Sequence, residues 1–271
     1  MRHVPRKRFG QHFLVDEPAI AAIVAAIAPQ PGDRVVEIGP GLGALTQPLA
    51  DRLDQLQVIE IDRDIVARLR AALPAGRVTV LEGDALRFDF SALGPRLRVV
   101  GNLPYNISTP LLFHLARHTA AILDIHAMLQ KEVVERMVAA PSTSQYGRLS
   151  VMLQYRFEME QVLAVPAGAF RPVPRVESSV VRMVPFARLP HPAADEAALG
   201  KIVAAAFAQR RKTLRNALQG HFRPADFERL GVNAGLRAQD LRVEDFVRLA
   251  DEILKQERSG TTAGKSPFQV K

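Results

Sequence analysis

The feature that most constrains the fold is an alternation of short apolar runs with longer amphipathic stretches in the first half of the chain. The apolar runs typical of buried strands are 34–38, 56–61, 78–81, 97–100 and 126–129. Helical periodicity is found over 42–52, 63–73, 110–117 and 131–140. Strands spaced about 20 residues apart with helices between them indicate a parallel, doubly wound sheet. The expected fold class is therefore α/β, with a Rossmann-like doubly wound sheet.

The second half of the chain predicts the domain organisation. Two further strands, joined by a proline-rich loop over 165–176, are expected at 146–157 and 178–184. Composition changes at 185–192, and only helical patterns follow, at 201–219, 225–230 and 243–256. We therefore expect a first domain with a basic N-terminal arm over residues 1–188, a small all-helical domain over 189–258 and a disordered tail over 259–271.

Charge and composition narrow the class of partner. There are 36 lysines and arginines against 28 aspartates and glutamates, a formal net charge of +8, which favours a polyanionic partner such as nucleic acid. The chain has no cysteine, so disulfides and thiolate metal sites are excluded, and we expect no metal. The longest apolar stretch, 20–28, is far shorter than the roughly 20 residues of a membrane-spanning helix and lacks the order of a signal peptide. We expect a cytoplasmic protein with no membrane partner.

A functional site is predicted at Asn102-Leu103-Pro104-Tyr105, where the strand candidate 97–100 ends. Ligands of open α/β sheets bind at the carboxyl ends of strands. The Asn102 side chain and the Leu103 carbonyl can each accept one N–H of an exocyclic amine, and Tyr105 can stack on a flat ring. This combination suits the N6 amine of adenine and favours a methyl donor as the reagent. The same residue types are also common in ordinary turns.

The loops after the first three strands predict a nucleoside cofactor. Gly39 and Gly41 let the backbone turn sharply beside the N-terminus of a helix. Glu60 ends the second strand and is placed to accept hydrogen bonds from ribose hydroxyls. Asp84 follows the third strand and can accept the adenine amine, or can cap a turn. With Asn102 after the fourth strand, these make four features at successive strand ends, which indicates one binding site.

Two residues of the glycine loop bear on which cofactor is bound. The spacing of the glycines also satisfies a loose dinucleotide fingerprint, so a nicotinamide cofactor stays open at this point. Pro40 removes an N–H that a pyrophosphate would use, and Glu37 would repel a pyrophosphate but could orient an ammonium group. These residues favour S-adenosyl-L-methionine.

Together the motifs resemble the ribosomal RNA adenine N6-dimethyltransferases, and within them the bacterial enzymes that dimethylate two adjacent adenosines in the hairpin near the 3′ end of 16S rRNA. The resemblance covers about positions 5 to 256. The segments that carry it are 7–14, 37–43, 60–62, 83–85, 102–107, 130–133, 146–150, 170–178 and 210–216. One departure is His12, which stands where many members carry asparagine.

The resemblance implies roles for individual residues. S-adenosyl-L-methionine would be contacted by His12, Leu14, Gly39, Glu60, Asp84 and Asn102, with Gly41 beside them. The target adenine would leave its stack and lie between Tyr105 and Phe170, although a phenylalanine in a proline-rich loop more often packs in a core. The expected catalytic residues are Asn102, Leu103, Pro104, Tyr105 and Phe170. No catalytic base is expected, because the methylated amine loses its proton readily to water.

Basic residues predict where RNA is held. The expected helix 201–219 carries four positive charges within six residues, and further ones lie in the N-terminal arm and beside the expected base pocket. Such residues bind phosphates without reading bases, and the alternative is an ordinary solvated surface. The residues expected to contact RNA are Arg6, Lys7, Arg8, Arg171, Arg175, Arg210, Arg211, Lys212 and Arg215.

The expected function is dimethylation of N6 of two adjacent adenosines in 16S rRNA, within the small (30S) ribosomal subunit or its precursor. A further role in small-subunit biogenesis and a monomeric state are also expected. Four alternatives stay open: a 23S rRNA adenine dimethyltransferase of the antibiotic-resistance type, a mainly non-catalytic assembly factor, a DNA adenine methyltransferase and a nicotinamide enzyme. The residues 102–105 disfavour the last of these.

Overall fold

The computed structural model describes residues 12–74 and 76–258. These residues form two compact units. Unit 1 contains the described chain up to Glu135 together with Phe157–Pro185, and unit 2 contains Arg136–Arg156 together with the described chain from Phe186 onward. No helix in either unit is long and apolar enough to cross a membrane.

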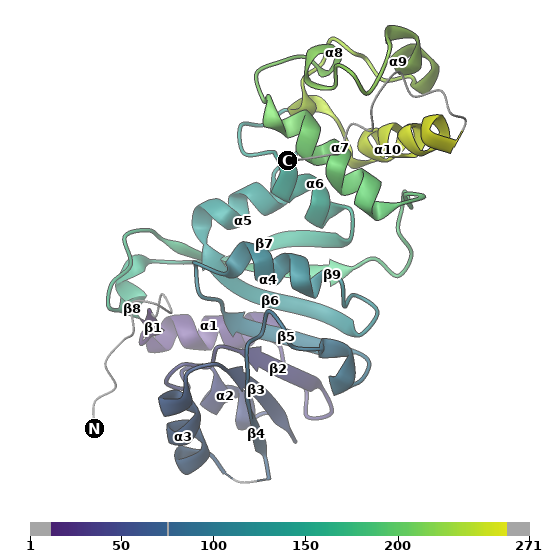
Figure 1. Ribbon diagram of the computed structural model, residues 1–271. Coiled ribbons are helices and arrows are strands. Elements are labelled where there is room, and N and C mark those ends of the chain that lie inside the picture. The colour runs from purple at the N-terminus through teal and green to yellow at the C-terminus, as the bar shows by residue number, and fades with distance from the viewer. Residues whose placement is uncertain (1–11, 75, 259–271) are drawn as a thin grey trace. The chain divides into compact units, whose positions relative to one another are not determined.

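Unit 1 is built on a seven-stranded sheet with the order β4-β3-β2-β5-β6-β9-β7 (Figure 1). The strands are β2 Arg34–Ile38, β3 Leu56–Glu60, β4 Val78–Glu82, β5 Leu97–Asn102, β6 Ile122–Gln130, β7 Phe157–Val165 and β9 Ser178–Pro185. Neighbouring strands from β4 to β6 are parallel, whereas β9 is antiparallel to β6 and β7. The expected α/β class with a doubly wound, Rossmann-like sheet is confirmed. Because strand order reverses between β2 and β5, a crevice is expected at their carboxyl ends.

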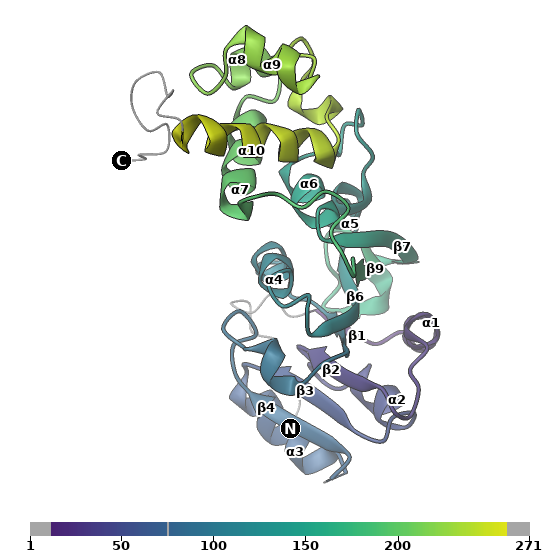
Figure 2. The same cartoon turned by 90° about the vertical axis from the view of Figure 1, so that its right-hand side faces the viewer.

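Helices cover both faces of this sheet (Figure 2). On one face, α1 Glu17–Ile27, α2 Thr46–Ala50 and α3 Arg63–Ala72 share one apolar cluster with the strands. On the other face lies α4 Ser108–Leu115. A short antiparallel pair, β1 Phe13–Leu14 and β8 Phe170–Arg171, stands apart from the main sheet. The 3-10 turns η2 Phe90–Leu93 and η3 Ala167–Ala169 also lie in this unit.

The structure corrects the strand predicted at 146–157. Those residues form helix α6 Arg148–Gln154 and a turn before β7. The apolar residues Leu149, Val151 and Leu153 alternate, which suggested a strand, but all three are buried in a short helix. The Ser150 hydroxyl accepts the Gly147 N–H at 3.0 Å and so satisfies a donor at the start of this helix.

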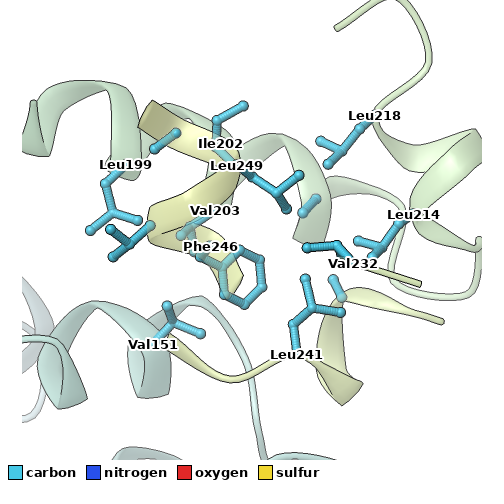
Figure 3. Packing of buried hydrophobic residues seen from close by; sticks show 14 of the residues in the cluster. Val151, Leu199, Ile202, Val203, Leu214, Leu218, Val232, Leu241, Phe246 and Leu249 are labelled. Carbon is cyan, nitrogen blue, oxygen red and sulfur yellow. The ribbon is translucent and has the colours of Figure 1, made fainter. Parts of the chain in front are cut away.

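Unit 2 is helical and has its own apolar core (Figure 3). After α5 Lys131–Val138, which begins in unit 1, its elements are α6, α7 Glu196–Ala208, α8 Leu214–Ala217, α9 Pro224–Leu230, η4 Ala238–Asp240 and α10 Val243–Arg258. Val151 of α6 belongs to this core together with Val203 and Phe246. The segment 136–156 therefore packs with the C-terminal helices, a difference from the expected division at residue 188. The expected tail, 259–271, lies outside the described residues.

The single helix predicted over 201–219 is also corrected. Helix α7 ends at Ala208, and α8 begins only at Leu214. The backbone N–H groups of Leu214 and Arg215 donate to the carbonyls of Leu236 and Ala234, at 2.7 and 3.1 Å, instead of to residues of α7. Like charges four residues apart, at 211 and 215, also disfavour a continuous helix.

Candidate active site

One pocket of unit 1, with a volume of about 270 Å³, collects nearly all the predicted catalytic and cofactor-binding residues. It lies at the carboxyl ends of β2, β3, β4 and β5, where the reversal of strand order predicts a crevice. Each of these strands is followed by a loop that lines the pocket, and segment β1 lines it as well. Predicted residues found in the lining are His12, Leu14, Gly39, Gly41, Glu60, Asp84, Asn102, Leu103, Pro104 and Tyr105.

The floor of the pocket depends on close backbone packing. Gly39 and Gly41 have φ values of +68° and +56°, a conformation that side-chain-bearing residues rarely adopt. A Cβ on Gly41 would also lie 3.1 Å from the Phe13 ring. At Gly101, just before the tetrapeptide, a Cβ would lie 2.4 Å from the Ile38 carbonyl oxygen, so β5 can approach β2 this closely only with glycine.

Two carboxylates face the pocket at the ends of β3 and β4. Glu60 Oε1 accepts the N–H groups of Ile61 and Asp62, both at 2.9 Å, and these bonds fix the direction of the carboxylate. Burial raises the pKa of Glu60, while its backbone hydrogen bonds act in the opposite direction. Asp84 Oδ1 accepts the Leu86 N–H at 2.9 Å, so this residue both caps its turn and lines the pocket.

A third carboxylate, Glu37 on β2, lies deeper in the same pocket. Its side chain is only 2% exposed, and Oε2 has no hydrogen-bond partner among the described residues. Burial, with a contribution from the nearby charge of Glu60, raises the pKa of Glu37 to about 7. No lysine or arginine is found among the described residues that line the pocket. The pocket therefore favours a ligand group that carries positive charge over a phosphate.

Asn102 is held in one orientation by the segment before β1. Its Nδ2 donates to the His12 carbonyl at 3.1 Å. Because that carbonyl can only accept, the amide must turn its nitrogen toward His12 and its Oδ1 away from it. The next residue, Leu103, is fixed by donation of its N–H to the Met128 carbonyl at 3.1 Å. The arrangement leaves the Oδ1 of Asn102 and the carbonyl of Leu103 as acceptors beside the pocket.

Tyr105 is fixed at its hydroxyl and on one face of its ring. Its hydroxyl forms a 2.6 Å hydrogen bond with the Ser178 hydroxyl, and burial raises the Tyr105 pKa. The His12 ring stacks on it, with centroids 5.8 Å apart and planes inclined by 25°. His12 Nδ1 in turn donates to the Pro172 carbonyl at 2.8 Å. A flat aromatic group therefore already lies beside Tyr105 in this structure.

Phe170 is the predicted catalytic residue that the structure does not bring to the pocket. It pairs with Leu14 in the β1–β8 ladder and is completely buried in the core of unit 1. In this position its ring offers no exposed face to a base. Its partner Leu14 lies 156 residues earlier in the chain, and this pairing directs the Phe170 ring into the core. The position agrees with the expectation that a phenylalanine in a proline-rich loop more often packs in a core.

The predicted RNA-contacting residues are distributed over both units. Arg171 and Arg175 are exposed in unit 1, and the four basic residues that begin at Arg210 are exposed in unit 2. Arg210 is not free, because its guanidinium donates to the carbonyls of Ser144 and Tyr146. The basic residues of the N-terminal arm, Arg6, Lys7 and Arg8, lie outside the described residues.

Sequence reasoning missed three contributors to the site: Phe13, which packs against Gly41, Ser178, which binds Tyr105, and the Pro172 carbonyl, which binds His12. Phe13 and Ser178 lie inside the motif segments 7–14 and 170–178, which indicate that their surroundings are functional. Their partners could not be foreseen, because each contact joins residues far apart in the sequence.

Comparison with known proteins places the chain in a family. It matches the family model described as ribosomal RNA adenine dimethylase over residues 2–255. It is 62% identical over 244 residues to ribosomal RNA small subunit methyltransferase A of Thiobacillus denitrificans. This match covers 90% of this chain and 96% of that protein. The corresponding protein of Chromobacterium violaceum is 60% identical over 253 residues, with 93% and 97% covered.

Solved structures agree with this placement. A dimethyladenosine transferase from Plasmodium falciparum superposes with a TM-score of 0.75 at 25% identity, covering 92% of this chain and 98% of that one. The 23S rRNA methyltransferase ErmE has a TM-score of 0.68 at 29% identity, with 90% and 100% covered. Sequence, fold and pocket thus lead to one conclusion: the chain belongs to the ribosomal RNA adenine dimethylase family.

Proposed function

We propose that this protein transfers methyl groups from S-adenosyl-L-methionine to N6 of two adjacent adenosines in the hairpin near the 3′ end of 16S rRNA, in the small ribosomal subunit or its precursor. The observation that carries the proposal is the fixed orientation of Asn102, whose Nδ2 donates to the His12 carbonyl. Two acceptors, Asn102 Oδ1 and the Leu103 carbonyl, stand at the pocket that also holds the carboxylates of Glu60 and Asp84.

The residues of the pocket fit S-adenosyl-L-methionine. Glu60 and Asp84 offer acceptors for ribose hydroxyls and an adenine amine, and the unpartnered Oε2 of Glu37 suits an ammonium group. A bound cation would favour the ionised form of Glu37 and lower its raised pKa. When bound, S-adenosyl-L-methionine supplies an electrophilic methyl group. The expected binding residues are His12, Leu14, Gly39, Gly41, Glu60, Asp84 and Asn102.

The acceptors would activate the amine of the target base. The lone pair of the adenine amine is delocalised into the ring, so the amine is a poor nucleophile. Hydrogen bonds from its two N–H groups to Asn102 Oδ1 and the Leu103 carbonyl favour a pyramidal nitrogen with its lone pair available. Alignment of nucleophile and electrophile by fixed groups then supplies most of the rate enhancement.

The second methyl transfer proceeds with one N–H fewer. The monomethylated amine keeps a single proton, so only one of the two acceptors is used at that stage. The proton lost after each transfer goes to water, so the site requires no catalytic base. Tyr105 would supply a stacking surface for the base, a contact worth roughly 1–3 kcal/mol.

The choice of substrate rests on the relatives. Proteins named as small-subunit methyltransferases are about 60% identical to this chain, whereas the 23S rRNA methyltransferase ErmE is 29% identical. The small-subunit substrate is therefore favoured over the 23S alternative. A cytoplasmic location, a monomeric state and a role in small-subunit biogenesis belong to the same proposal.

The test is transfer of labelled methyl from S-adenosyl-L-methionine to small subunits isolated from cells that lack this methylation, with large subunits in parallel. We expect label as dimethyladenosine in the 3′-terminal hairpin, and none with an Asn102→Ala variant. A Gln161→Ala variant, on the exposed edge strand β7, is the control and should retain full activity. Label on the large subunit, or none on the small subunit with the unaltered protein, would contradict the proposal.

A further inference from the structure

The loop between β8 and β9 borders the base end of the pocket. Residues 172–177, here called the rim loop, are bound at both ends to pocket-lining side chains. At its start, the Pro172 carbonyl accepts from His12 Nδ1 at 2.8 Å. At its end, the next residue, Ser178, forms the 2.6 Å bond with Tyr105. His12 and Tyr105 both line the pocket, so RNA that delivers a base there would pass this loop.

The rim loop is held rigidly. Pro172 and Pro174 each fix one backbone dihedral and restrict the residue before them, and Pro174 is buried. Glu177 is bound twice by Lys131, through the backbone at 3.0 Å and through the side chains at 2.7 Å. The loop therefore presents its exposed side chains in a fixed arrangement.

Two of these exposed side chains are valines. Val173 is 55% exposed and Val176 is 44% exposed. A single exposed valine carries no information, since scattered apolar residues are normal on protein surfaces. Here two of them share a six-residue braced loop, together with the exposed Arg175, and neither valine lines the pocket itself. Apolar side chains next to a cation suit a nucleic-acid strand, whose bases are apolar on their faces and whose phosphates are anionic.

We propose that Val173 and Val176 form an apolar wedge that packs against the bases exposed when the target adenosine leaves its stack. Extrusion of a base removes stacking contacts from its neighbours, and inserted apolar side chains replace such contacts in proteins that bend nucleic acid. The wedge makes an adenosine within a stacked RNA segment, rather than a free nucleoside, the class of substrate that the site accepts. This inference rests on the proposed function.

The wedge predicts a change in the rate of transfer rather than in RNA affinity. In a Val173→Thr/Val176→Thr double variant the side-chain shape is kept and the apolar surface is reduced. We expect kcat on small subunits to fall about tenfold, which corresponds to about 1.4 kcal/mol. The Kd for subunits, measured by filter binding, and the Kd for S-adenosyl-L-methionine, measured by calorimetry, should change less than twofold. A Val173→Ile/Val176→Ile variant, which keeps the apolar surface, should have the kcat of the unaltered protein.

The matched control is Val15→Thr, the same change at a valine that is 48% exposed and lies outside the rim loop. It should behave as the unaltered protein. An unchanged kcat in the double threonine variant would overturn the wedge, and so would a weaker subunit Kd with kcat intact. Failure of the unaltered protein to methylate subunits, while it still binds S-adenosyl-L-methionine, would instead overturn the proposed function and the wedge with it.

Discussion

The two ends of strand β5 use polar side chains in opposite ways. Near its amino end, Arg98 is buried and fully engaged: it donates to Asp124 at 2.9 Å, to Asp33 at 2.6 Å and to the Ile27 carbonyl at 2.6 Å. At its carboxyl end, Asn102 uses one donor to fix its own direction and keeps an acceptor at the pocket. On this strand, the buried polar group that serves the fold is fully paired, whereas the one at the pocket keeps an acceptor available for a ligand.

The first prediction concerns the buried ion pair near the amino end of β5. Asp124→Ala leaves the Arg98 charge, with an 11% exposed side chain, without its bidentate partner. Loss of one partner from a buried pair costs about 3–5 kcal/mol. We expect that decrease in the free energy of unfolding, measured by denaturant titration. Glu160→Ala removes half of the exposed pair with Arg182 and should cost less than about 1 kcal/mol. If the two variants lost the same stability, the buried pair of Arg98 and Asp124 would not be more important to the fold than an exposed pair.

The second prediction concerns Glu37, whose buried side chain lies near the carboxyl end of the neighbouring strand β2. The folded-state pKa of Glu37, about 7, lies above its ordinary value of 4.5, so the folded chain keeps a proton that the unfolded chain releases. Stability is therefore lost as pH rises from 4.5 to 7, by roughly 3 kcal/mol in total. Glu37→Gln should remove this loss, so that the variant is the more stable protein at pH 8. The exposed Glu158→Gln is the control, and the same pH profile in both variants would refute the account.

The third prediction separates the two features of Tyr105. Tyr105→Ala removes the stacking surface, so kcat/KM for methyl transfer should fall about tenfold to a hundredfold, in line with the roughly 1–3 kcal/mol of a base stack. Tyr105→Phe keeps the ring and loses only the bond to Ser178, and should fall less than about fivefold. If the two variants were equally impaired, the ring would have no stacking role.

The fourth prediction concerns the affinity for RNA that residues of unit 2 contribute. Because Arg210 is bound to backbone carbonyls, Arg211 and Lys212 are the better candidates for phosphate contacts. Replacing both with glutamine should lower the slope of log Kd against log salt by about one per residue. Arg242→Gln, at a residue paired with Glu244, should leave the slope unchanged. A slope that does not fall in the double variant would exclude these contacts.

The difference between the two ends of β5 also explains which features the sequence could predict. Gly39, Glu60 and Asn102 follow apolar runs directly, and the carboxyl ends of parallel strands must meet, so their proximity follows from the fold class. The pairing of Arg98 with Asp124 and Asp33 joins residues 26 and 65 positions apart, and no local pattern encodes it.

The errors also have physical causes. Helix α6 was predicted as a strand because a short buried helix shows no single periodicity. The position of Phe170 is set by its pairing with β1, a tertiary contact that a local sequence pattern does not reveal. The basic residues after α7 are in a turn, because α8 binds a distant loop through its backbone.

The central claim is that Asn102 serves the ligand and not the fold. Its most direct test is to measure both the free energy of unfolding and methyl transfer to small subunits for Asn102→Ala. We predict a loss of stability no greater than about 1.5 kcal/mol, the value of the one hydrogen bond to His12, together with loss of transfer by a factor of at least about 100. Retained transfer in a strongly destabilised protein would contradict the account.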